Sequence, residues 1–228
     1  MKIRICVPLA AYNPLDLVPL IERAESEGAD LIEIRLDYME KLEGVEKLVE
    51  HTSVPLIATN RQHQEGGSRV QDEETRIKNL IEAAESGFQY ADIELTAKDV
   101  ADVASKLRDL GVKPIVSFHD FKSTPSQDEL EKIANIQIES GAELCKMVTT
   151  ANNIEDNLTC LQLLSKMSRT TKLVCFAMGE KGVVSRALSP IFGGYFTYAS
   201  LESGMETAAG QISISELKSL YRILGVGG

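Results

Sequence analysis

The stretch that decides the fold runs from residue 113 to residue 150 and reads "KPIVSFHDFKSTPSQDELEKIANIQIESGAELCKMVTT". It opens with a β-rich run (113–120), continues into an amphipathic helical run (126–141) and ends in a second β-rich run (143–150). Gly141 closes the helical run, as expected of a helix C-cap. Strand, helix and strand in this order pair in parallel through a right-handed crossover. The stretch therefore predicts one βαβ unit.

The same alternation fills the rest of the chain without a linker or a break in composition. We predict strands at 2–10, 30–38, 54–61, 90–95, 113–120, 143–150, 172–179 and 195–200. Helices are predicted at 14–28, 44–51, 72–87, 98–111, 126–141, 154–168, 185–194 and 213–224. Eight regular units in 228 residues favour a single (β/α)8 barrel, an α/β TIM-barrel domain over residues 1–228. An open doubly wound sheet is the alternative, although no G-x-G-x-x-G follows the first strand.

The composition of the chain indicates which partners the protein can bind and in which cellular compartment it is expected. The formal net charge of −10 argues against nucleic acid or an anionic membrane as the main partner. No apolar run reaches the roughly 18 residues of a membrane span, and the N-terminus lacks the pattern of a signal peptide. The cysteines are scattered without a C-x-x-C pair, so we expect reduced thiols and a cytoplasmic protein. They are Cys6, Cys145, Cys160 and Cys175.

Two residues on neighbouring predicted strands suggest amine chemistry. Lys146, in the middle of its strand, shares a face with Leu144 and Val148, and if this face points into the barrel the amine is desolvated. Desolvation favours the free amine of a lysine, which can form a Schiff base with a carbonyl group. His119 ends the preceding strand and is a candidate general acid and base. The alternative is a structural Lys146 that pairs with an interior carboxylate.

Further charged and polar residues occur at strand ends or in the loops that follow them, where barrels of this type hold their active sites. Arginine forks suit carboxylates and phosphates, so the set predicts a pocket for an acidic substrate. An iminium ion formed at a lysine is an electron sink, which lets a base remove a neighbouring proton and a β-hydroxyl leave as water. The residues are Glu33, Arg35, Arg61, Glu65, Arg186 and Gln211.

An ordered set of motifs along the whole chain resembles the type I 3-dehydroquinate dehydratases. The set comprises "EIRLD" (33–37), "TNR" (59–61) with "EGG" (65–67), "SFHDF" (117–121), "KMVTT" (146–150), "AMGEKGVVSR" (177–186) and "TAAGQIS" (207–213). The resemblance implies conversion of 3-dehydroquinate to 3-dehydroshikimate and water, in the shikimate pathway of aromatic amino acid biosynthesis. It implies a homodimer that uses neither a cofactor nor a metal ion.

The resemblance also implies a role for each matching residue. Lys146 forms the Schiff base with the C3 ketone, His119 moves the C2 proton, and Glu65 supports these transfers. The implied substrate-binding residues are Glu33, Arg35 and Arg61 at the hydroxyls, Arg186, Thr207 and Gln211 at the carboxylate, and Met178 and Tyr198 in the pocket wall. Thr207 replaces a serine and Tyr198 a phenylalanine of the family pattern.

Three other functions share some of these residues. A class I aldolase barrel would also use Lys146, with Arg186 binding a phosphate. A metal-dependent isomerase could use Glu33, Glu94 and His119 as ligands. A barrel that binds a carboxylic acid without turnover is the non-enzymatic alternative.

Overall fold

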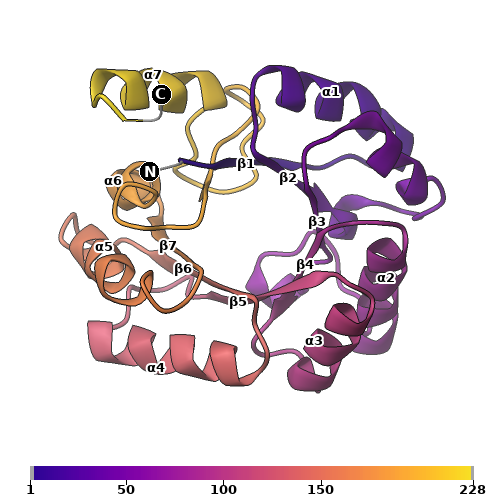
Figure 1. The fold of residues 1–228 in the computed structure, drawn as a ribbon, viewed down its shortest axis with the longest axis horizontal. Helices are drawn as coiled ribbons and strands as arrows, with labels where there is room; N and C mark the ends of the chain where they lie inside the picture. Colours follow the sequence, from indigo (N-terminus) through magenta and orange to yellow (C-terminus); the bar gives the residue numbers. More distant parts are fainter. Residues whose placement is uncertain (1–2, 227–228) are drawn as a thin grey trace.

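Eight parallel strands form the wall of a barrel and follow one another around it in chain order (Figure 1). The computed structural model describes residues 3–226. The strands are β1 (Ile5–Leu9), β2 (Leu31–Arg35), β3 (Leu56–Thr59), β4 (Tyr90–Glu94), β5 (Lys113–His119), β6 (Leu144–Thr150), β7 (Leu173–Met178) and β8 (Thr197–Tyr198).

The sheet closes almost completely on itself. Strand β1 pairs with both β2 and β8, and the ladder continues from β2 to β7 in sequence order. Between β7 and β8, the backbone N–H of Tyr195 donates to the carbonyl oxygen of Leu173 at 2.8 Å. A doubly wound sheet would reverse its strand order at a switch point, and this sheet does not. The predicted barrel is confirmed and the open-sheet alternative is wrong.

Helices surround the barrel on its outer side (Figure 1). The α-helices are α1 (Val18–Ser26), α2 (Glu73–Glu85), α3 (Val100–Asp109), α4 (Gln127–Glu139), α5 (Asp156–Met167), α6 (Val183–Leu188) and α7 (Ile214–Ile223). Local sequence sets several helix starts. Before α4, the Ser126 side chain accepts from the backbone of Glu129, whose carboxylate accepts from the backbone of Ser126. This capping box satisfies two backbone donors.

Three predicted helices differ from the structure. The helix expected at 14–28 starts as a 3-10 helix, η1 (Pro14–Leu17), before α1. Residues 44–51 were expected to be α-helical but form a 3-10 helix, η3 (Val45–His51). In a 3-10 helix residues three apart lie on one side, and here Val45 and Leu48 are both buried. The helix expected at 185–194 begins earlier, and α6 ends before Pro190, which has no N–H to continue it.

Alternation along β6 separates the barrel interior from the layer beneath the helices. Leu144 and Val148 pack with the interior cluster, which also contains Phe176 and Tyr198. Cys145 and Met147 point outward into a cluster with residues of α4 and α5. Lys146 shares the inward face and is only 4% exposed. The structure therefore places Lys146 inside the barrel, which is the condition that the Schiff-base interpretation set.

Candidate active site

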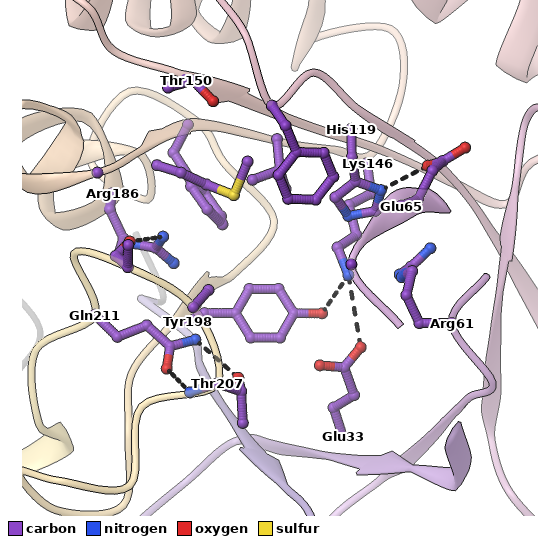
Figure 2. Close-up of a pocket in the computed structure, with 18 of the residues that line it drawn as sticks. Glu33, Arg61, Glu65, His119, Lys146, Thr150, Arg186, Tyr198, Thr207 and Gln211 are labelled. Carbon is purple, nitrogen blue, oxygen red and sulfur yellow. Dashed lines mark hydrogen bonds and ion pairs between the residues drawn. The ribbon is translucent and has the colours of Figure 1, made fainter. Parts of the chain in front are cut away.

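One cavity of about 290 Å³ opens at the carboxyl ends of the strands (Figure 2). The structure brings every predicted site residue to its lining. They are Glu33, Arg35, Arg61, Glu65, His119, Lys146, Met178, Arg186, Tyr198, Thr207 and Gln211. These residues come from six strands and the loops beyond them, so the barrel alone makes them neighbours.

Three oxygen atoms surround the amine of Lys146. Its Nζ lies 2.8 Å from Oδ2 of Asp92, 3.0 Å from Oη of Tyr198 and 3.5 Å from Oε1 of Glu33. An ammonium group has three N–H donors, and the three oxygens match that number. The three oxygens thus hold Nζ in a nearly buried position. Its Nζ is fixed at the floor of the cavity, beneath the ends of β2, β4 and β8.

Asp92 is the principal anion beside Lys146, and three neighbours hold it in place. Its carboxylate accepts from Oγ of Ser117 at 2.6 Å and lies 2.9 Å from Nη2 of Arg61. Burial alone would raise the pKa of this carboxyl group. Arg61 and Lys146 outweigh burial and hold the pKa of Asp92 below its ordinary value. Asp92 therefore stays ionised at neutral pH.

The Asp92 carboxylate is a site residue that the sequence prediction missed. The available signal was in "YADIEL" (90–95), where Asp92 and Glu94 share one face of an otherwise apolar strand. Both point into the barrel and both are fully buried. Glu94 was considered only as a metal ligand. Its oxygens instead accept from Arg61 at 2.8 Å and Arg76 at 2.7 Å, so they form ion pairs.

His119 and Glu65 form a hydrogen-bonded pair at the rim. Nδ1 of His119 lies 2.9 Å from Oε2 of Glu65, whose other oxygen accepts from Thr96. Burial lowers the pKa of His119 well below its ordinary value, and the nearby cations Arg61 and Lys146 lower it further. The imidazole is therefore neutral at pH 7. With Nδ1–H donating to Glu65, Nε2 is left with a lone pair and can act as a base.

Arg186 is a buried cation without an anion. It is 2% exposed, and within residues 3–226 no carboxylate pairs with it. Its Nη2 donates to the carbonyl oxygen of Ala209 at 3.3 Å, and its Cζ lies 4.4 Å above the Phe176 ring. Its Nε has no hydrogen-bond partner in the described part of the chain. Burial lowers the pKa of Arg186 to about 10. A buried guanidinium in this state is a site for an anion.

The loop after β8 presents polar groups beside Arg186 (Figure 2). The backbone N–H of Thr207 donates to Oε1 of Gln211 at 2.9 Å, and Nε2 of Gln211 donates to Oγ1 of Thr207 at 3.3 Å. The two side chains satisfy each other and shape the loop. Both can exchange these bonds for bonds to a carboxylate.

Three predicted binding residues, Arg35, Arg61 and Glu33, form hydrogen bonds or ion pairs with other groups of the protein. Arg35 forms a fork with Asp37, at 2.9 and 2.8 Å, which explains the third charge of "EIRLD". Arg61 uses Nη1 for Glu94 and Ser117, and Nη2 for Asp92. Glu33 accepts from Thr59 at 2.6 Å. These pairs line the cavity with fixed charges rather than mobile ones.

The fold and the site together define a class: an α/β-barrel enzyme with a buried lysine among carboxylates at the carboxyl ends of its strands. Residues 5–227 match the family model described as Type I 3-dehydroquinase. The chain belongs to this family.

Named relatives agree with that assignment. The 3-dehydroquinate dehydratase of Dehalococcoides mccartyi (strain CBDB1) is 37% identical over 198 residues, which cover 87% of each chain. A crystal structure of type I 3-dehydroquinate dehydratase from Clostridium difficile, with covalently modified comenic acid, has a TM-score of 0.88 and 28% identity. It covers 98% of this chain and 92% of that one. The Geobacillus kaustophilus 3-dehydroquinate dehydratase has a TM-score of 0.91 and 25% identity, with coverage of 99% and 92%.

Proposed function

We propose that this enzyme dehydrates 3-dehydroquinate to 3-dehydroshikimate through a Schiff base at Lys146. The observation that carries the proposal is the presence of two basic groups, the Lys146 amine and the Arg186 guanidinium, in one cavity. A buried amine is held by Asp92 at 2.8 Å on one side, and the unpaired guanidinium of Arg186 lies across the cavity (Figure 2). A substrate with a ketone at one end and a carboxylate at the other complements both groups.

Arg186 is assigned to the substrate carboxylate. Since the guanidinium has no anion of its own, a carboxylate that enters the cavity gains a charge-assisted pair and relieves the cost of burying the cation. Thr207 and Gln211 add donors beside it. Glu33, Arg35 and Arg61 provide polar groups for the hydroxyls of the ring, and Met178 and Tyr198 cover its apolar parts.

Lys146 and His119 divide the chemistry. The free amine attacks the C3 ketone, and the resulting carbinolamine loses water to form an iminium ion. The iminium withdraws electrons from C2, where neutral His119 removes a proton. The protonated His119 then donates its proton to the C1 hydroxyl, which leaves as water as the double bond forms, and hydrolysis of the iminium returns the amine. Glu65 orients the imidazole and stabilises its charged form.

Reductive trapping tests this proposal. Incubation with 3-dehydroquinate and borohydride is expected to add one reduced substrate to Lys146, detected by mass spectrometry of peptides. The enone product is followed by its ultraviolet absorbance. Lys146→Ala should lose both signals. Trapping by a sugar phosphate in place of 3-dehydroquinate would favour the aldolase alternative, and binding without enone formation would favour the non-enzymatic one.

We also propose a homodimeric assembly and a cytoplasmic location. Exposed apolar side chains near α5, among them Ile154, Leu158 and Phe192, support a contact surface. The four cysteines are free and buried, which suits a reducing compartment. Within residues 3–226 no helix has both the length and the apolarity needed to cross a bilayer. Light scattering after size-exclusion chromatography tests the dimer, because a monomer mass would contradict it.

A further inference from the structure

The hydroxyl of Tyr198 lies within hydrogen-bonding distance of the reacting nitrogen of Lys146, so this side chain does more than line the cavity. Its Oη lies 3.0 Å from Nζ of Lys146, and the side chain is 4% exposed. Figure 2 shows the ring reaching across the cavity from β8 with its hydroxyl directed at the lysine. His119 and Glu65 lie on another side of the same nitrogen. Tyr198 therefore contacts the amine independently of the His119–Glu65 pair.

Packing holds the Tyr198 ring in this orientation. Its ring meets that of Phe196 edge to face at 5.3 Å and that of Phe176 at 6.1 Å. Such pairs fix the plane of a buried ring. The phenol is thus aimed by its neighbours and does not have to be ordered when substrate enters.

Among the three oxygens around Lys146, the phenol differs in kind from the carboxylates. Ionised Asp92 and Glu33 can only accept hydrogen bonds, whereas a phenol can accept and donate. Tyr198 can accept an N–H of the ammonium form and donate to an oxygen or to the free amine. Within the described residues, it is the one group contacting Nζ that can do both.

Schiff-base formation includes a proton transfer that a group of this kind can carry. When the amine nitrogen attacks the carbonyl carbon, an N–C bond forms, the C–O double bond becomes single, and the nitrogen is left positive beside an alkoxide. One proton must then pass from nitrogen to oxygen. The two atoms share a single carbon, so a hydroxyl hydrogen-bonded to one lies within reach of the other.

We propose that Tyr198 is a catalytic residue that relays this proton. Its Oη accepts a proton from the nitrogen while its own proton passes to the alkoxide, so the phenol ends the step as it began. The product is a neutral carbinolamine, whose hydroxyl leaves as water when the nitrogen lone pair forms the C–N double bond. The reverse path serves iminium hydrolysis. The inference rests on the proposed function, because it assumes a ketone substrate at Lys146.

Electrostatics supports the neutral phenol that a relay requires. Burial raises the pKa of Tyr198 well above its ordinary value, and the nearby carboxylate of Glu33 adds to the effect. The phenol therefore keeps its proton at neutral pH and regains it readily after the transfer.

The test compares two substitutions that each remove one phenolic oxygen. Tyr198→Phe deletes the hydroxyl on Lys146. Tyr195→Phe is the matched control, because the Tyr195 hydroxyl bonds that of Tyr90 at 3.1 Å, at the opposite end of the barrel. Borohydride quenching in a single turnover with 3-dehydroquinate measures adduct formation, and absorbance measures the enone. Calorimetry with a hydroxylated cyclohexane carboxylate that lacks the ketone reports whether the pocket is intact.

We expect Tyr198→Phe to slow adduct formation about 100-fold, with enone appearance falling in step. Binding of the ketone-free acid should change less than threefold, and Tyr195→Phe should match the wild type throughout. Adduct formation at the wild-type rate in Tyr198→Phe would overturn the relay. Loss of acid binding in parallel with the rate would also overturn it, since the hydroxyl would then act by shaping the pocket. If the wild type forms no adduct with 3-dehydroquinate, the proposed function itself fails before any variant is compared.

Discussion

Replacing Arg186 by methionine should stabilise the fold and abolish the activity. Burial lowers the pKa of Arg186 from its ordinary value to about 10, and one pKa unit corresponds to about 1.4 kcal/mol. The folded chain therefore carries a penalty of about 3 kcal/mol for keeping this cation without an anion. Arg186 is charged in both the folded and the unfolded chain at pH 7, so the penalty does not vary between about pH 5 and pH 9.

Two favourable contacts of Arg186 reduce the net gain. The hydrogen bond to Ala209 contributes about 1 kcal/mol and the stacking on Phe176 about 1 kcal/mol. Arg186→Met should thus raise the free energy of unfolding by about 1 kcal/mol, equivalent to roughly 2–4 °C in Tm for a chain of this size. The value of kcat/KM should fall at least about 100-fold, because the substrate carboxylate loses a buried charged partner.

Urea unfolding in a buffer free of phosphate, sulfate and carboxylates measures the stability, since such anions would occupy the site and mask the penalty. The matched control is Arg169→Met, which removes an exposed arginine and should change stability by less than about 0.5 kcal/mol. An Arg186→Met chain that is less stable than the wild type would refute the argument that this guanidinium is unpaired. Near-normal kcat/KM would refute its role at the carboxylate.

Three further outcomes follow from the site. Burial, Arg61 and Lys146 lower the pKa of His119, which acts as a base only when it is deprotonated. The fall of kcat/KM at acid pH should therefore have its midpoint below pH 6.5. A midpoint above that value would contradict the assignment of His119 as the base. Asp92→Asn should destabilise the fold by about 3 kcal/mol in urea at pH 7, because it breaks a buried ion pair. The pKa of Asp92 is lowered in the folded state, so its contribution is present above the unfolded pKa near 4 and is lost as pH falls through the folded pKa. The stability difference should shrink below pH 4, whereas a constant difference down to pH 3 would exclude the ion pair as its source. Gly67→Ala would place a Cβ against the carbonyl oxygen of Arg61, so the loop after β3 must shift. The value of kcat should fall about tenfold in the enone assay, and an unchanged kcat would contradict the need for this loop geometry.

The sequence by itself determined the barrel and which residues share a strand face. Strand and helix periods are local properties, and eight regular repeats leave few topologies for a chain of this length. The same periodicity put Lys146 on one face with Leu144 and Val148, and the fold rule identified polar residues at the carboxyl ends of the strands. Where local pattern was weak, as at residues 44–51 and 185–194, helix type and bounds depended on packing and on Pro190.

Only the tertiary structure decided which charges meet. Asp92 and Lys146 are 54 residues apart on strands separated by β5, and the curvature of the barrel brings their atoms to 2.8 Å. Closure of the barrel places Tyr198 of β8 on the lysine of β6, while Arg186 is buried with no anionic partner among the described residues. A strand's alternation specifies a face but not a depth or a partner. Charge pairing depends on distances of a few ångströms between distant segments, and only the closed barrel sets those distances.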